Sequence, residues 1–179
     1  YYLSEKLADI QYNFINLPSR IEFENGHVIS YLYDADGIKL RTTHIIGSDT
    51  TVTDYCGNVI YENGIPVKLL TEAGYVTLAD SKYHYFVQDH LGNNRVVVDQ
   101  SGNVEEVNHY YPFGGLLSSS VSNAVQPYKY NGKELDRKNG LDWYDYGARM
   151  YDAALGRWHA VDPMSEKYYS WSPYTYCMG

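Results

Sequence analysis

Short apolar runs alternate with turn residues along the whole chain. The stretches 31–33, 51–53, 85–87 and 96–98 carry β-branched or aromatic residues, and a segment that contains glycine follows each of them. Such units recur at intervals of about ten residues, which is the spacing of serial antiparallel strands. The pattern predicts a mainly β protein, built as a meander of antiparallel hairpins.

One turn unit, Asp-x-x-Gly, occurs four times, and two Asn-Gly pairs add further turn signals. An aspartate at the first turn position accepts hydrogen bonds from nearby backbone N–H groups, and glycine supplies a positive φ without steric cost. Flanking strand residues then pair as a hairpin. The copies are Asp34-Ala35-Asp36-Gly37, Asp54-Tyr55-Cys56-Gly57, Asp89-His90-Leu91-Gly92 and Asp99-Gln100-Ser101-Gly102, and the pairs are Asn25-Gly26 and Asn63-Gly64.

Asp34 and Asp36 could also open a calcium loop. The further ligands and the glutamate at the twelfth position of such a loop are missing, so the pattern favours a plain turn over a metal site. Elsewhere the histidines are scattered and show no metal-binding spacing. No metal and no cofactor is predicted.

The composition is dominated by tyrosine, with 21 tyrosines against 4 phenylalanines and 3 tryptophans. Tyrosine suits a pleated, half-buried surface, where its ring packs and its hydroxyl reaches a polar partner. Helix is expected only as short pieces near 132–137 and 152–157, so strand should exceed helix at least twofold. The aromatic residues expected to be mostly buried are Tyr85, Tyr111, Phe113, Tyr130, Trp143, Tyr151 and Trp158.

Charge and hydropathy exclude two classes of partner. The net charge is -8 and lysine and arginine do not cluster, which argues against nucleic-acid binding. No apolar run approaches the length of a membrane span. Cys56 and Cys177 leave two readings open, either a disulfide or two unpaired cysteines.

From residue 31 onward the chain resembles the RHS/YD-repeat family. The segment from Tyr31 to Leu40 is similar to a YD repeat, and the segment from Tyr83 onward resembles the RHS repeat-associated core. The motifs that carry the second likeness are Asp89-His90-Leu91-Gly92-Asn93 with Arg95, Tyr110-Tyr111-Pro112-Phe113-Gly114, Gly132-Lys133-Glu134, Tyr144-Asp145-Tyr146-Gly147-Ala148-Arg149-Met150-Tyr151-Asp152, Leu155-Gly156-Arg157-Trp158 and Asp162-Pro163. Met150 and Trp158 depart from the family pattern only in packing.

The resemblance implies an architecture and a function. Residues 1–82 would form a YD-repeat region and 83–179 a core region, both within a spiral β-shell. We expect the chain to be part of a longer secreted or cell-surface protein. Its role would be structural, to enclose or display a C-terminal effector or toxin, and its partners would be that effector and neighbouring repeats.

Two alternatives to a purely structural role remain. In autoproteolytic relatives, paired aspartates near the end of the core are thought to cut the chain, and Asp162 matches one of them. The second Asp-Pro-x-Gly motif is missing, so a dyad cannot be assigned and a turn at Asp162-Pro163 is favoured. A weaker alternative is a carbohydrate-binding surface of exposed aromatic rings.

Arginines also lie among carboxylates near the C-terminus. Arg149 and Arg157 are expected to form a structural ion-pair set rather than a substrate site, because arginine binds carboxylates bidentately and fixes local geometry. The carboxylates available to that set are Asp142, Asp145, Asp152 and Asp162.

A chain cut from a shell would leave sheet edges open. Strands within residues 1–14 and near the C-terminus should present unpaired N–H and C=O groups, and a second copy offers the nearest matching edge. We therefore predict a dimer or larger assembly with few charged residues at its contact. Light scattering over a range of concentrations tests this, and a strictly monomeric species up to about millimolar contradicts the open-edge argument.

Overall fold

The computed structural model describes residues 7–117, 121–122 and 126–177 and shows a long antiparallel sheet. Its twelve strands lie in chain order, each paired with the next, which confirms the predicted meander. The strands are β1 (Leu7–Tyr12), β2 (Pro18–Phe23), β3 (Val28–Tyr33), β4 (Lys39–Ile46), β5 (Asp49–Cys56), β6 (Val59–Glu62), β7 (Ile65–Thr71), β8 (Gly74–Thr77), β9 (Lys82–Gln88), β10 (Asn94–Asp99), β11 (Val104–Val107) and β12 (Val121–Ser122).

A second, smaller sheet follows in the C-terminal third. It contains β13 (Glu134–Asp136), β14 (Trp143–Asp145), β15 (Met150–Asp152) and β16 (Arg157–Trp158), again antiparallel and in chain order. Helix in the described part of the chain is limited to the 3-10 turns η1 (Tyr130–Gly132), η2 (Lys138–Gly140) and η3 (Ser165–Lys167). Strand therefore exceeds helix by far more than twofold, and no helix there is long and apolar enough to cross a membrane.

The expected short helical turns near the C-terminus are present, but not at the two segments expected to form them. The segment 132–137 contains β13, which pairs residue by residue with β14. The segment 152–157 is a tight turn between β15 and β16, begun by Asp152, whose Oδ1 accepts hydrogen bonds from the N–H groups of Ala154 and Leu155. Cross-strand pairing in the first segment and side-chain capping of a turn in the second replace the expected helical hydrogen bonds.

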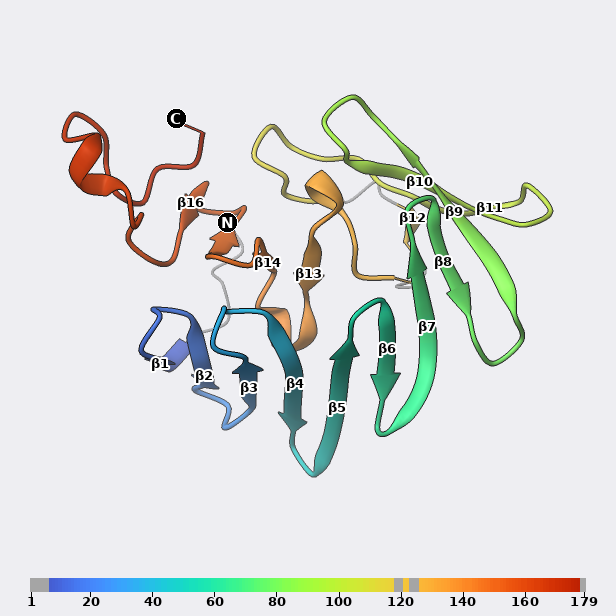
Figure 1. Ribbon diagram of the computed structural model, residues 1–179, viewed down its shortest axis with the longest axis horizontal. Helices are drawn as coiled ribbons and strands as arrows, with labels where there is room; N and C mark the ends of the chain where they lie inside the picture. Colours follow the sequence, from blue (N-terminus) through green and yellow to red (C-terminus); the bar gives the residue numbers. More distant parts are fainter. Residues whose placement is uncertain (1–6, 118–120, 123–125, 178–179) are drawn as a thin grey trace.

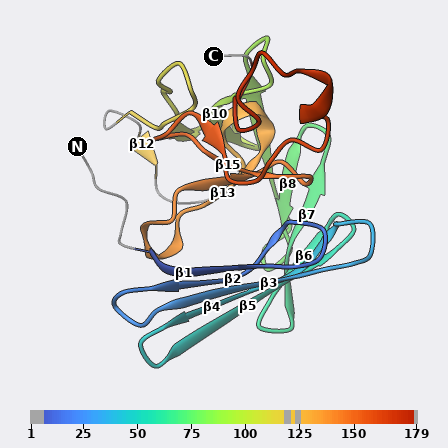
Figure 2. The same cartoon turned by 90° about the vertical axis from the view of Figure 1, so that its left-hand side faces the viewer.

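The long sheet bends around the small one. Strands β1–β6 form one layer, and the small sheet lies over it (Figure 2). Strand β7 leads away from that layer, and β8–β11 stand on the other side of the C-terminal segment (Figure 1). We call the face of β2–β7 that carries Ile21, Ile29, Tyr31, His44 and Tyr55 the inner face, because these side chains point toward the small sheet.

Three of the four Asp-x-x-Gly units form the predicted turn. In the turn between β9 and β10, Asp89 Oδ1 accepts from the N–H groups of Leu91 and Asn93, at 3.0 and 3.1 Å. The Gly92 N–H donates to the Asp89 carbonyl at 3.0 Å, and Gly92 has a φ of 76°. The turns at Asp34 and Asp99 repeat this pattern. All three are type I turns completed by a glycine bulge.

The fourth unit does not form that turn. Asp54 lies inside β5, where its carboxylate contacts Arg41 of β4 at 2.5 Å. Cys56 pairs directly with Val59, so the chain reverses through the two residues Gly57 and Asn58. The cross-strand ion pair and the longer strand account for the shifted turn.

The core consists of two apolar clusters. The first joins the repeat strands to the small sheet through Trp143, Leu141 and Met150, and its repeat-strand members are Ile21, Phe23, Ile29 and Tyr31. The second lies within the C-terminal part and consists of Tyr130, Leu135, Tyr144, Tyr151 and Tyr176. Cys56 and Cys177 are both free and exposed, so the disulfide reading is wrong.

The expectation that seven aromatics are mostly buried holds for four of them. Tyr130, Trp143 and Tyr151 are buried, and Trp158 is half-buried. Tyr85 is exposed because strand alternation turns its neighbour His84 inward instead. Tyr111 and Phe113 are exposed because they lie in a turn that contacts the core through its backbone.

One edge of the long sheet is open within the described residues. Strand β1 pairs with β2 on one side and with no described strand on the other. Residues 1–6 belong to the N-terminal segment 1–14 that was expected to present unpaired backbone groups, and they lie outside the described residues. The predicted assembly through open edges stays a prediction.

Trp143 offers a direct test of the contact between the sheets. Its side chain is 2% exposed and packs among residues of β2, β3 and β15. Truncation in Trp143→Ala should lower the free energy of unfolding by about 3–5 kcal/mol, because a large cavity remains. The control Trp171→Ala removes an exposed ring and should change stability by less than about 0.5 kcal/mol. Urea denaturation measures both, and equal effects contradict a shared core.

Candidate functional site

Charged side chains meet between the inner face and the small sheet. Lys39, the first residue of β4, places its Nζ 2.7 Å from Glu134 Oε2 and 2.7 Å from Asp145 Oδ2. Glu134 and Asp145 lie directly opposite each other on β13 and β14. The Tyr55 hydroxyl of β5 donates to the other Glu134 oxygen at 2.7 Å. One ammonium group thus serves two neighbouring carboxylates.

A second contact lies two residues further along β13. Asp136 Oδ2 accepts from the Tyr31 hydroxyl at 2.9 Å and lies 3.0 Å from His44 Nε2. Alternation along β13 places Glu134 and Asp136 on the same face, so both reach the repeats. We call the seven residues of these two contacts the interlayer network, namely Tyr31, Lys39, His44, Tyr55, Glu134, Asp136 and Asp145.

Electrostatics favours the charged forms within this network. Burial by itself raises the pKa of Asp136, but hydrogen bonds and charge from His44, Tyr31 and Lys39 outweigh it and lower that pKa. Burial likewise lowers the pKa of Lys39, yet the Glu134 and Asp145 carboxylates hold it well above its usual value. The charged forms of Lys39 and Asp136 are therefore favoured at neutral pH.

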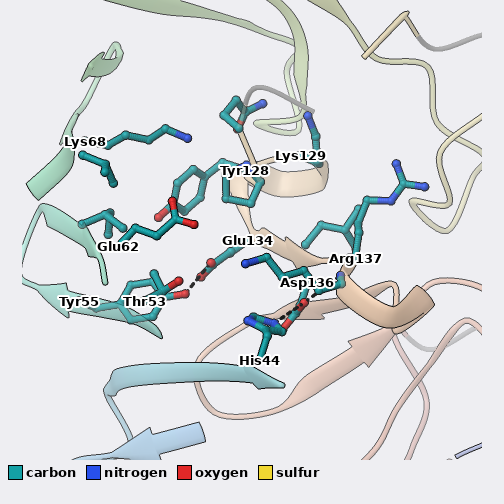
Figure 3. A pocket seen from close by; sticks show the side chains of 16 residues that line it. His44, Thr53, Tyr55, Glu62, Lys68, Tyr128, Lys129, Glu134, Asp136 and Arg137 are labelled. Atoms are coloured by element: carbon teal, nitrogen blue, oxygen red, sulfur yellow. Dashed lines mark hydrogen bonds and ion pairs between the residues drawn. The ribbon is translucent and has the colours of Figure 1, made fainter. Parts of the chain in front are cut away.

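A cavity of about 350 Å³ adjoins the interlayer network. It lies between β4–β7 and the segment 126–138 and is lined by both acidic and basic side chains (Figure 3). Two of its buried polar atoms, His44 Nδ1 and Gln126 Oε1, have no hydrogen-bond partner. The hollow suits water or a small polar molecule. Within the described residues, no three His, Cys, Asp or Glu side chains are grouped to hold a metal ion.

The Tyr-x-Pro-Phe-Gly motif is held by three buried tyrosines. The hydroxyls of Tyr130, Tyr151 and Tyr144 donate to three successive carbonyls, of Pro112 at 3.1 Å, Phe113 at 2.8 Å and Gly114 at 2.9 Å. Gly114 has a φ of 87°, and a Cβ there would lie 2.6 Å from the Tyr130 ring. The motif thus serves as a backbone acceptor for the tyrosine cluster.

Asn131 joins another motif turn to the same cluster. Its backbone N–H donates to Asn93 Oδ1 at 2.8 Å, and its Nδ2 donates to the Leu91 carbonyl at 3.0 Å. Its Oδ1 accepts from the hydroxyls of Tyr146 at 2.6 Å and Tyr176 at 2.9 Å. The turn that begins at Asp89 is thereby connected to the C-terminal tyrosines.

The remaining motif residues of the central segment have local roles. Asp34 and Gly37 form the turn between β3 and β4. The Arg95 guanidinium lies 4.0 Å from Asp89 Oδ2 and 5.6 Å from the Tyr110 ring centre. Gly132, the last residue of η1, has a φ of 67°, and Lys133 Nζ lies 5.4 Å from the Tyr146 ring centre.

Of the ion pairs expected between the two C-terminal arginines and nearby aspartates, the described residues form one. Arg149 contacts Asp162 at 3.0 Å and lies over the Trp158 ring. Asp142 and Asp145 pair instead with Arg137 and Lys39, and Asp152 lies 3.6 Å from His159. Arg157 is exposed beside the Gly156 turn. The fold places Lys39, Arg137 and His159, and not the two arginines, next to these three aspartates.

Asp162 begins a turn. Its Oδ1 accepts from the Met164 N–H at 2.8 Å across Pro163, and its other oxygen binds Arg149.

Sequence reasoning named Glu134 only as part of a motif and missed Lys39, Tyr55 and Asp136. The alternation Glu134-Leu135-Asp136 was a usable signal, because it places two carboxylates on one face of a strand.

Comparison with known proteins assigns a family. The Teneurin YD-shell family model matches residues 69–175, which is more than half of the chain. The chain belongs to this YD-shell family. The match agrees with the predicted likeness to RHS/YD-repeat proteins, while the predicted boundary between residues 82 and 83 stays a prediction.

Relatives of this YD-shell chain are much longer proteins. Salivary gland surface protein 1 of Aedes aegypti is 30% identical over 97% of the chain, and the chain spans 6% of its length. Toxin subunit YenC1 of Yersinia entomophaga is 30% identical over 62% of the chain, and the chain spans 13% of that protein.

Solved structures share the fold. The Photorhabdus luminescens Tc holotoxin pore structure superimposes with a TM-score of 0.77 over 95% of the chain, at 18% identity, and the chain covers 9% of the matched chain. A TcdB2-TccC3-TEV crystal structure gives a TM-score of 0.71 over 87% of the chain, at 19% identity. The YD-shell chain therefore has the fold of a segment of these large β-shells.

The two cations of β4 allow a matched test of the interlayer network. Lys39→Met leaves Glu134 and Asp145 buried without a counter-ion and should lower the free energy of unfolding by about 3–5 kcal/mol. Arg41→Met removes an equally short ion pair whose arginine is half exposed, and should cost far less, because solvent screens that pair. Chemical denaturation compares the two, and similar losses would refute the role of Lys39.

Proposed function

We propose that this chain is a structural shell segment of an RHS/YD-repeat protein that encloses a C-terminal effector. The main observation that supports this proposal is that the small sheet packs on the inner face of the repeats. The interlayer network and the cluster around Trp143 hold the small sheet at the bend of the long sheet. A shell built from segments docked in this way would separate an interior from the surroundings.

The family and its relatives support this proposal. The family model describes a YD shell, and two matched relatives are named toxin subunits. A third is named a surface protein. We therefore infer that the parent protein is secreted or presented at a cell surface, and that its partners are neighbouring repeats and its own effector. In this role the chain uses no cofactor.

The contacts of Asp162 favour a structural role over a catalytic one. Asp162 is engaged by Arg149 and by the backbone of its own turn, as a turn-starting residue would be. Self-cleavage of the parent protein remains the alternative function, and it makes a distinct prediction. A carboxylate dyad would cut the chain without added protease.

Limited proteolysis of the natural full-length protein tests enclosure. The segment C-terminal to this chain should be cleaved far more slowly in the native protein than after denaturation. Lys39→Met should speed its cleavage, and Arg41→Met should not, because only the former weakens the interlayer network.

Two outcomes would change the proposal. Equally fast cleavage of the effector in native and denatured protein contradicts enclosure. It would mean that the shell displays the effector on its outer surface. A defined truncated product that forms before protease is added, and that Asp162→Asn abolishes, supports the autoproteolytic alternative.

A further inference from the structure

Three buried polar side chains donate to one buried carboxylate oxygen outside the interlayer network. Glu106 of β11 is 0% exposed, and its Oε1 accepts from Lys129 Nζ at 2.5 Å and from Gln126 Nε2 at 3.0 Å. Asn108 Nδ2 donates to the same oxygen. Lys129 lies before β13 and points away from Glu134 and Asp136 (Figure 3). An amine and a carboxamide thus share one acceptor.

The backbone holds the amine and the carboxamide in place. The Asn94 N–H donates to the Lys129 carbonyl at 3.1 Å. The Asn94 carbonyl accepts from Asn108 Nδ2, also at 3.1 Å, and the Asn108 N–H donates to the Arg95 carbonyl at 2.7 Å. Both groups are therefore anchored to β10. Such preorganisation replaces a collision between free groups by a small side-chain movement.

The hydrogen-bond pattern around Glu106 lacks a donor. Glu106 Oε2, Asn108 Oδ1 and Gln126 Oε1 are buried and have no hydrogen-bond partner. Transfer of the Lys129 proton to the Glu106 carboxylate, which it already contacts, would give that group a hydroxyl donor. Burial also lowers the pKa of Lys129, which favours its neutral form. The neutral amine is a nucleophile, and a carboxamide lies beside it.

We propose that Lys129 and Asn108 become joined by an intramolecular amide bond, with Glu106 as the proton shuttle. After Glu106 takes the ammonium proton, Lys129 Nζ attacks Asn108 Cγ. The Nζ–Cγ bond forms and the Cγ–Nδ2 bond breaks. Glu106 gives its proton to the departing nitrogen and takes one from Nζ, and ammonia leaves. The step needs no oxidant, reductant or further reactant.

The bond would close a covalent loop from residue 108 to residue 129. This loop contains the Tyr-x-Pro-Phe-Gly turn, whose carbonyls bind the tyrosine cluster. A cross-link of this kind restricts the unfolded chain and so stabilises the fold. It would tie β11 of the long sheet to the segment that leads into β13.

Mass spectrometry of the natural protein that contains this chain tests the proposal. After denaturation and proteolysis, the peptides with Asn108 and Lys129 should emerge as one cross-linked species, lighter than their sum by one ammonia. Lys129→Met and Glu106→Gln should each give two separate peptides of full mass. The control Lys68→Met alters a lysine that lines the neighbouring cavity and should keep the cross-link.

Three results overturn the proposal. Separate peptides of full mass in the unmodified protein show an ion pair and no bond. Fragment spectra that place the link at Gln126 assign another acceptor. Loss of ammonia that persists in Lys129→Met places the reaction elsewhere, as in cyclisation of an asparagine with its own backbone. The unmodified protein decides the first two, so the test does not depend on the folding of a variant.

Discussion

The contact of Lys39 with Glu134 and Asp145 is the constraint on which the joining of the two sheets depends. The two carboxylates face each other across a strand pair, an arrangement that is destabilising by itself. They are also largely buried, so solvent screens them little. The ammonium group that contacts both comes from the repeat sheet. The pairing of β13 with β14 is thus stabilised when the small sheet is docked on the repeats.

Tyrosine hydroxyls take a similar role inside the C-terminal part. A turn such as 111–115 carries carbonyls that water would bind if the turn were exposed. Three ring hydroxyls from different elements bind these carbonyls, so the aromatic cluster is both apolar packing and a set of donors. Phenylalanine would fill the same volume and leave the carbonyls unpaired. This explains why tyrosine and not phenylalanine stands at positions 130, 144 and 151.

The sequence predicts features whose determinants lie within a few residues of each other. The turns at Asp34, Asp89 and Asp99 need only the aspartate, the glycine and two flanking strands, and all three form. Asp54 shows the limit, because its fate depends on Arg41 in the neighbouring strand.

The candidate site lies beyond such local reasoning. Lys39 and Glu134 are 95 positions apart, and nothing near either residue specifies the other. The exposure of Tyr85 has a related cause, since the face that a strand buries is decided by what docks on it. Family motifs indicated which residues matter, but they did not show that the residues from Pro112 to Gly114 act through their carbonyls.

Apolar and ionic contacts make different contributions to the junction of the two sheets. The cluster around Trp143 supplies most of the stabilisation, because burial of apolar area is the dominant favourable term in folding. Apolar contact alone tolerates a shift of register, since one aliphatic side chain can replace another. A one-residue slip of β13 would turn Leu135 toward Lys39 and Glu134 away from it. The interlayer network therefore selects the register in which the tryptophan cluster forms, and the two contacts together specify one arrangement of the two sheets.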